Sequence, residues 1–338
     1  MDRSLQGSSS PRRACPSRRR GRGSSALQQE ALGPRLRGDD RFAVTCAGMT
    51  KRLVFRLLLL VLMCAPAYAV TVTDDRGVTL NFPQPPQRIV TLLPSLAETV
   101  CELGACDRIV GVDSYTNWPQ RLRQLPHVGA LDDTNIETVV GLKPDLVLLS
   151  ASSRAMGRLE GLGIPVMGLE LKTLNDVQRA LDRLGQVLGL QGASQVWNRM
   201  QAGIDEAARS VPARLRGTTV YFEVASGPYA ASESSHIGEL LARIGAANVV
   251  PAQLGSVPKL NPEFVVRADP QVIMISGRND QGLGGRPGWN RIRAIRNERV
   301  CVFTPEQGDI IVRPGPRLAQ AAHLLSQCLQ GTLKGSAP

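Results

Sequence analysis

Aromatic residues are scarce in this chain, at 4% of 338 residues, and histidine occurs only three times. His127, His236 and His323 lie far apart, and there is no Cys-x-x-Cys motif or Cys/His cluster. Zinc and other bare transition metals are bound by several such ligands, so this class of site is disfavoured. The motifs G-x-x-x-x-G-K-[ST], H-E-x-x-H and G-x-S-x-G are also absent, which removes the usual signs of a P-loop, zinc-protease or hydrolase site.

The positive charge of the chain is confined to its front end. The formal net charge is +11, but residues 1–69 hold 13 lysines and arginines against 4 acidic residues. The rest of the chain holds 27 basic and 25 acidic residues and is nearly neutral. The body of the protein therefore gives no electrostatic reason to expect a nucleic-acid partner.

Residues 49–69 have the pattern of a signal peptide. A basic start at Met49–Arg52 is followed by the apolar run Leu57–Met63 and by the small-x-small site Ala67-Tyr68-Ala69. We expect cleavage after Ala69 and export to the periplasm. Lipidation at Cys64 is the alternative, disfavoured because the bulky Met63 precedes it. The apolar run is much shorter than the ~20 residues of a membrane span.

Residues 1–48 are rich in arginine, serine and glycine and show no apolar periodicity. Signal peptides act from the N-terminus, so we expect translation to start at Met49 and residues 1–48 to be a mis-assigned start. A disordered basic arm is the alternative.

Four cysteines follow the expected cleavage point, and export makes disulfides plausible. Cys101 and Cys106 flank Gly104, where a helix is predicted to end, so we expect them to pair. Cys301 on a predicted strand and Cys328 on the last predicted helix would then form the second bridge.

A stretch of fifteen residues occurs twice, as NIETVVGLKPDLVLL at Asn135–Leu149 and as NPEFVVRADPQVIMI at Asn261–Ile275. Each copy predicts a short helix capped by asparagine, stopped by proline, and followed by a buried strand of a parallel sheet. The acids Glu137 and Glu263 occupy the same place in the two copies. The repeat therefore predicts two similar lobes.

Midway between the copies, residues 193–210 place apolar side chains on one face at helical spacing. Eighteen residues make a rod of roughly 27 Å, about the width of a small domain. We expect an α/β fold with two parallel-sheet lobes, 70–190 and 213–332, joined by a single long rigid helix at 191–212. A helix packed inside one larger domain is the alternative.

Strands alternate with helices in both halves, which predicts parallel sheets. In the first half the expected strands are 88–93, 109–112, 146–149 and 166–169, preceded by an edge hairpin at 70–73 and 78–82. The expected helices there are 96–103, 154–161 and 176–188. In the second half we expect strands at 219–224, 272–275 and 300–303, helices at 236–244 and 317–329, and loops at 225–235, 276–288 and 304–314.

Four of the few aromatic residues fall in or beside loops that follow predicted strands: Tyr115, Trp118, Tyr229 and Trp289. Ligands of open parallel sheets lie beyond the carboxyl ends of the strands. The four rings therefore suggest stacking on a flat ligand, while pinning each loop to its own lobe is the alternative.

The segments RIVTLLPSLAETVCELG, VGVDSYTNWP, NIETVVGLKPDLVLL and KLNPEFVVRADPQVIMI resemble the periplasmic substrate-binding proteins of ABC importers, of the cobalamin and iron-siderophore type. The resemblance covers about residues 86–330 and is closest to the vitamin B12-binding members. It implies two lobes joined by one rigid helix and, as partners, a small-molecule ligand and a permease dimer. In that family a glutamate on each lobe docks to arginines of the permease, and the matching positions are Glu137 and Glu263.

The resemblance also implies ligand contacts. Tyr115 matches an aromatic position lining the cleft of B12-binding members, and Tyr229 falls where they carry another ring. Two of their tryptophans have no counterpart, at Ala130-Leu131 and near Lys259. We expect cobalamin or a related corrinoid in the cleft, with these ligand-binding residues: Tyr115, Trp118, Tyr229, Trp289 and Arg313.

A haem or ferric-siderophore receptor of the same build is the alternative, because Arg278, Arg286 and Arg313 could clamp an anionic ligand. A periplasmic enzyme on this scaffold ranks third, since no activated nucleophile or acid–base pair is visible. We expect a monomer that is not an enzyme and needs no cofactor or structural metal.

Overall fold

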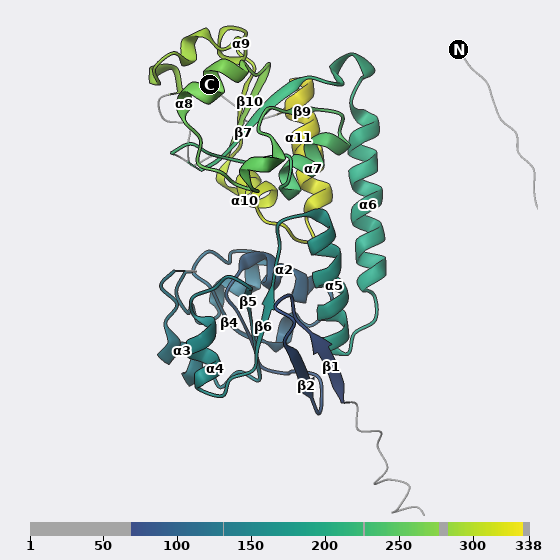
Figure 1. The fold of residues 1–338 in the computed structure, drawn as a ribbon. Coiled ribbons are helices and arrows are strands. Elements are labelled where there is room, and N and C mark those ends of the chain that lie inside the picture. Colours follow the sequence, from purple (N-terminus) through teal and green to yellow (C-terminus); the bar gives the residue numbers. More distant parts are fainter. Residues whose placement is uncertain (1–68, 131, 226, 277–282, 334–338) are drawn as a thin grey trace, which may run out of the picture. The chain divides into compact units, whose positions relative to one another are not determined.

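The computed structural model describes residues 69–130, 132–225, 227–276 and 283–333, all within one compact unit. The predicted leader and the signal peptide up to Tyr68 lie outside the described residues, as does Arg278. No helix in the described ranges is long and apolar enough to cross a membrane. Figure 1 shows two α/β lobes with one long helix running along both. The predicted fold class is therefore confirmed.

The first lobe is built on a parallel four-stranded sheet. Its strand order is β4 (Ile109–Val112), β3 (Ile89–Thr91), β5 (Leu146–Ser150) and β6 (Val166–Leu169). The antiparallel hairpin of β1 (Val70–Thr73) and β2 (Thr79–Phe82) forms a separate two-stranded sheet. The helices are α2 (Pro94–Glu102), α3 (Ile136–Gly141), α4 (Met156–Gly161) and α5 (Leu174–Leu188).

The second lobe has a sheet of the order β11 (Val300–Val302), β10 (Val272–Ile275), β7 (Thr219–Ala225) and β8 (Tyr229–Ala230), and β9 (Ala247–Asn248) also pairs with β7. Only β8 runs antiparallel to its neighbour among these described strands. The helices are α7 (His236–Arg243), α8 (Pro262–Ala268), α9 (Arg293–Arg296), α10 (Pro305–Val312) and α11 (Leu318–Gln330).

The repeat seen in the sequence is a repeat in three dimensions. Asn135 caps α3 by accepting from Thr138 N at 2.9 Å, and Asn261 caps α8 by accepting from Glu263 N at 3.0 Å. Both helices are followed by a residue with positive φ and then a proline, which ends the helix. Both following strands, β5 and β10, pair with a parallel strand on each side and are buried.

The connecting helix α6 (Ala193–Ser210) has the predicted bounds. Its buried face holds Val196, Met200 and Ile204, at the helical spacing expected from the sequence. This face packs against α5, α7 and α11. Gly203 lies so close to α11 that an added Cβ would be 2.6 Å from Ala319 Cβ. The connecting helix is therefore buried along one side and packs on both lobes, and it is not an isolated linker between them.

One apolar cluster runs through both lobes, because alternate side chains of each sheet point toward the α5–α6–α11 side. It contains Leu148 of β5, Ile204 of α6 and Phe222 of β7. The other face of each sheet has a cluster of its own, with Leu149 in the first lobe and Ile273 in the second. This period-2 alternation between two buried faces explains why the strands are continuously apolar.

The structure corrects the prediction of a loop at 304–314, because α10 occupies most of this range. Thr304 and Gln307 form a capping box, and Pro305 takes the first helical position. The predicted loop at 225–235 contains the short strand β8, and the short elements α9 and β9 were not predicted either. Both disulfides are present with the predicted pairing, Cys101 with Cys106 and Cys301 with Cys328.

Candidate functional site

The loop after β4 carries two exposed rings at the carboxyl end of the first sheet. Tyr115 is 56% exposed and Trp118 is 49% exposed. The buried Asp113 shapes the loop, since its carboxylate accepts from Tyr115 N at 2.8 Å and from Thr116 Oγ1 at 2.5 Å. Burial raises the pKa of Asp113, against the lowering effect of these hydrogen bonds. Both rings are therefore accessible from solvent.

Tyr229 presents the corresponding ring on the second lobe. It lies in β8, just after the carboxyl end of β7, and is 40% exposed. The ammonium of Lys259 lies 5.9 Å from the centre of its ring, and the two residues form an isolated β-bridge. The ring is therefore held on one side by its own lobe and open on the other.

Trp289 does not provide a fourth exposed ring, which corrects the prediction. Its side chain is 0% exposed and packs edge-on against Tyr221, with ring centres 6.0 Å apart. The guanidinium carbon of Arg286 lies 4.4 Å from the centre of the Trp289 ring. Trp289 is a core residue of the second lobe. This agrees with the alternative stated from the sequence, in which a loop aromatic packs against its own lobe.

Arg286 is committed to an internal pair. It donates to the buried Glu223 at 2.6 and 2.8 Å, and the Tyr221 hydroxyl also donates to Glu223, at 3.1 Å. Burial, followed by the negative charge of Glu223, raises the pKa of Tyr221. A bidentate pair of this kind leaves Arg286 little capacity to clamp an anionic ligand.

Arg313 is also occupied, and its predicted role as a ligand contact is not supported by its position. Its side chain is 8% exposed and pairs with Glu98 at 3.0 Å and with Asp309 at 2.9 Å. It also donates to Asn117 Oδ1 at 2.8 Å and to Tyr115 O at 2.9 Å. Three of these four partners, Glu98, Asn117 and Tyr115, belong to the first lobe.

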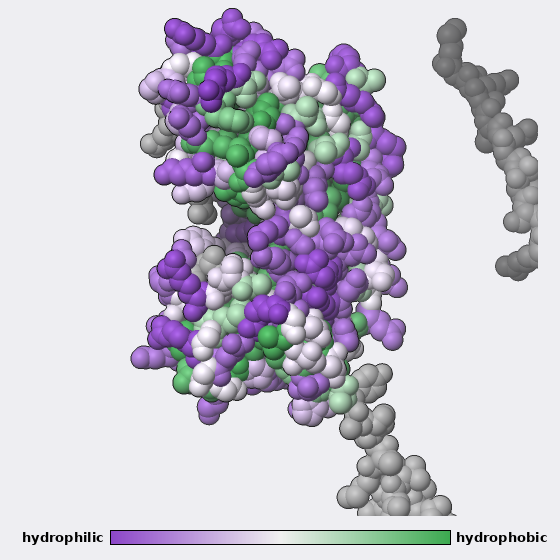
Figure 2. All heavy atoms as spheres, viewed as in Figure 1, coloured by the Kyte–Doolittle hydropathy of each residue, from purple (hydrophilic) through white to green (hydrophobic). Residues whose placement is uncertain are grey.

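A cavity of about 340 Å³ lies where the Trp118 loop meets α10 and α11. Its lining residues are Asn117, Trp118, Arg123, Glu306, Asp309, Ile310, Arg317 and Gln320. The Arg317 guanidinium carbon lies 5.8 Å from the centre of the Trp118 ring. The cavity is at the small end of the ~300–1,000 Å³ range of ligand pockets. Figure 2 shows the surface hollowed between the two lobes on the side away from α6.

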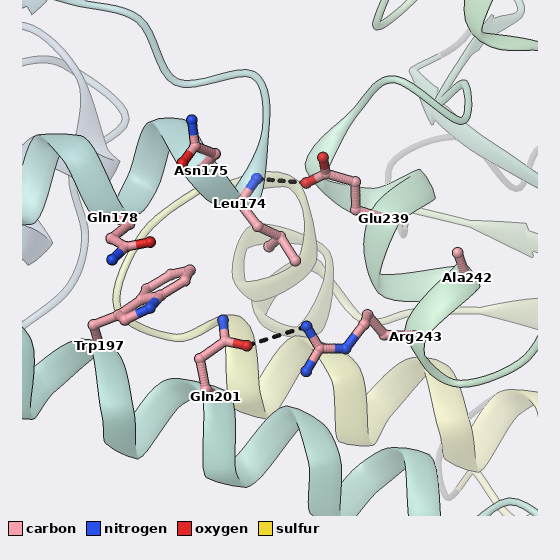
Figure 3. Close-up of a pocket in the computed structure, with 8 residues that line it drawn as sticks. All are labelled: Leu174, Asn175, Gln178, Trp197, Gln201, Glu239, Ala242 and Arg243. Carbon is pink, nitrogen blue, oxygen red and sulfur yellow. Dashed lines mark hydrogen bonds between the residues drawn. The ribbon is translucent and has the colours of Figure 1, made fainter.

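A second hollow, of about 510 Å³, lies on the α6 side, where α5, α6 and α7 meet (Figure 3). Glu239 of α7 accepts from Leu174 N at the start of α5, at 2.5 Å, and so links the lobes. Arg243 donates to Gln201 of α6 at 3.1 Å. These residues were not singled out from the sequence.

The paired acids Glu137 and Glu263 are both exposed, each in the first turn of its helix. In Figure 1 both helices, α3 and α8, lie on the side of their lobes away from α6. The two carboxylates are thus accessible and occupy the same position in two corresponding helices.

Sequence reasoning missed the residues that join the lobes, above all Glu98 and Arg317. Arg317 donates to Glu98 at 2.6 and 2.8 Å. The two residues are 219 positions apart, so no spacing pattern connects them. A buried glutamate in an apolar helix was the one available signal, because such a charge needs a partner.

Comparisons with known proteins agree with this architecture. The periplasmic binding protein family matches residues 89–307. The ABC transporter substrate-binding lipoprotein YvrC of Bacillus subtilis (strain 168) is 29% identical, over 78% of this chain and 86% of that protein. The vitamin B12-binding protein of Pectobacterium atrosepticum is 26% identical, over 77% of this chain and 89% of that protein.

Among solved structures, a periplasmic heme binding protein from Pseudomonas aeruginosa is 28% identical with a TM-score of 0.60, over 75% of this chain and 95% of that one. The Bacillus relative is named as a substrate-binding lipoprotein of an ABC transporter, and the Pseudomonas protein is named as a periplasmic heme binding protein. Because the family match spans more than half of the sequence and the fold has the expected two lobes, this chain belongs to the periplasmic binding protein family.

Proposed function

We propose that this protein captures cobalamin or a related corrinoid between its lobes and delivers it to the permease of an ABC importer. The observation that carries the proposal is the set of exposed rings at the ends of the two sheets, Tyr115 and Trp118 on one lobe and Tyr229 on the other. Aromatic faces suit a large flat macrocycle. The vitamin B12-binding protein of Pectobacterium supports the same ligand class.

Haem is the second candidate, favoured by the similarity to the heme binding protein of Pseudomonas aeruginosa. An anionic siderophore receives less support. Of the three loop arginines that were candidates for an anion clamp, Arg286 and Arg313 are paired with buried carboxylates.

Ligand delivery would follow docking of the exposed Glu137 and Glu263 to arginines of the permease. Exposed carboxylates at fixed positions give such docking its orientation. The α6 helix packs along both lobes, so little hinge bending is expected on ligand binding, and the permease would separate the lobes on the cleft side.

Calorimetric titration of the exported protein against cyanocobalamin, cobinamide, haemin and ferric siderophores tests the ligand. We expect the tightest binding for a corrinoid. Tyr115→Ala and Tyr229→Ala should each weaken it about tenfold, because loss of one aromatic contact costs ~1.4 kcal/mol. Leu162→Ala is the control, since Leu162 is an exposed apolar residue outside the ring-bearing loops. Tighter binding of haemin, with a shifted Soret band, would favour the second candidate, and binding of none would refute both.

A further inference from the structure

A buried ion-pair network joins the two lobes. Glu98 of α2 is 1% exposed and accepts from both Arg313 and Arg317, on either side of the turn between α10 and α11. Arg313 in turn pairs with Asp309 at 2.9 Å. The turn lies close to α2, since a Cβ on Gly315 would be 3.4 Å from Ser95 O. Two arginines of the second lobe thus share one carboxylate of the first.

Arg313 also holds the loop that carries the exposed Tyr115 and Trp118 rings. Arg313 Nη2 donates to Tyr115 O at 2.9 Å, and Nη1 donates to Asn117 Oδ1 at 2.8 Å. Asn117 Nδ2 donates to Asp309 at 2.7 Å, so the Asn117 amide contacts both members of the Arg313–Asp309 pair. Three hydrogen bonds therefore run from the Tyr115–Trp118 loop to the second lobe.

The first lobe alone holds the start of this loop well but supports Asn117 only weakly. The buried Asp113 carboxylate accepts from Tyr115 N at 2.8 Å and from Thr116 Oγ1 at 2.5 Å, whereas Asn117 O accepts from Arg123 at 2.9 Å. Arg123 is itself exposed, so its hydrogen bond competes with water. The bond from Arg313 to Asn117 is better shielded from water, because the Arg313 side chain is buried, and it is therefore a stronger restraint on Asn117 than the bond from Arg123.

We propose that Arg313 is a positioning residue, which holds the ring-bearing loop in its binding conformation only while the lobes are together. Separation of the lobes on the cleft side would pull Arg313 away from Tyr115 O and Asn117. The loop would then lose its support at the moment the cleft opens, so ligand release and loop release are coupled. The effect on the ligand rests on the proposed function, whereas the positioning of the loop does not.

Hydrogen–deuterium exchange of the ligand-free protein tests the positioning role. In Arg313→Met the amides of residues 113–118 should exchange at least about tenfold faster than in the wild type, because the loop frays when its anchor is lost. Arg293→Met is the matched control, since Arg293 pairs with Asp269 within the second lobe. It should leave exchange in 113–118 unchanged.

Two further variants keep the test decisive if Arg313→Met fails to fold. Asn117→Ala removes two of the three hydrogen bonds and keeps the ion pairs with Glu98. Arg313→Lys keeps a positive charge but cannot reproduce the fork of donors. Both should speed exchange of the loop, and Arg313→Lys should do so less than Arg313→Met.

Dissociation of cyanocobalamin, followed by stopped flow, tests the coupling to the ligand. We expect dissociation at least about tenfold faster in Asn117→Ala and Arg313→Lys and unchanged in Arg293→Met. Unchanged loop exchange in all three loop variants would overturn the positioning role, whatever the ligand. Faster exchange with unchanged dissociation would overturn the coupling. A wild-type protein that binds no cobalamin, with the exchange result as expected, would refute the proposed ligand and leave the positioning role standing.

Discussion

His236 is a buried imidazole at the start of α7, where its Nε2 lies 2.9 Å from Ile311 O. A neutral ring that carries its proton on Nε2 can donate to this carbonyl. Burial lowers the pKa of His236 to about 4, which outweighs the raising effect of the hydrogen bond. The folded protein therefore keeps this residue uncharged at neutral pH.

This pKa shift predicts a loss of stability in mild acid. Below a pH of about 6.5 the unfolded chain binds a proton at this histidine and the folded chain does not, down to about pH 4. The free energy of unfolding should thus fall as pH drops through this window, by up to about 3 kcal/mol from His236 alone. Urea unfolding at about pH 7 and about pH 5 measures the effect.

His236→Gln separates this effect from other titrating groups, because glutamine stays neutral and can donate a hydrogen bond. The variant should lose less stability than the wild type between the two pH values. His323→Gln, at a half-exposed site on α11, controls for the introduction of glutamine. Equal losses in wild type and His236→Gln would show that His236 is not the source.

At the scale of elements, the contact between α6 and α11 depends on a small residue. Gly203 faces Ala319, and an added Cβ would lie 2.6 Å from Ala319 Cβ. Neither helix can move aside easily, because α6 also packs on α5 and α7, and α11 also packs on α10 and α7. Close packing here keeps the connecting helix attached to the second lobe.

Gly203→Ala should therefore destabilise the protein, although alanine is the better helix former. Overpacking costs ~1–3 kcal/mol, against ~1 kcal/mol gained from helix propensity. Gly157→Ala in α4 is the opposite case, since nothing lies within 4 Å of its added Cβ, and it should be neutral or stabilising. Thermal unfolding of both variants decides this, and a Gly203→Ala protein as stable as the wild type would show that α6 and α11 shift apart freely.

For the whole molecule, the apolar cluster shared by α5, α6 and α11 makes the two lobes one cooperative body on the α6 side. The cleft side is held by the polar network of Glu98, Arg313 and Arg317 instead. Opening the apolar side would expose buried surface, at about 25 cal/mol per Å². Separation of the lobes is therefore expected at the cleft.

Reversing both exposed acids, Glu137→Arg with Glu263→Arg, should abolish binding to the importer and leave the affinity for ligand unchanged. The carboxylates would be replaced by charges that repel permease arginines. Pull-down with the importer in nanodiscs and a parallel titration with ligand give the two readouts. The control, Asp182→Arg with Glu206→Arg, reverses two exposed acids on α5 and α6. Loss of ligand affinity in the first pair would mean that the acids belong to the cleft.

Much of this architecture can be read from local sequence. The strands β4, β6 and β10 and the helix α6 have the predicted bounds, because apolar periodicity and helix-stopping prolines act over a few residues. The duplicated segment predicted two lobes with matched acids, and both disulfide pairings followed from the placement of the cysteines on elements. Helix α10 was missed because the capping box at Thr304 was overlooked, not because the signal was absent.

Whether an individual side chain is buried, exposed or paired depends on tertiary packing. Trp289 and Tyr229 look alike in sequence, each beside a loop after a strand, yet one is buried and the other exposed. Arg313 looked like a free cation because its partner Glu98 is 215 residues away. Periodicity in the sequence specifies which face of a helix or strand is apolar. The burial and pairing of a given side chain depend on which distant element covers that face. Only the folded chain brings those elements together.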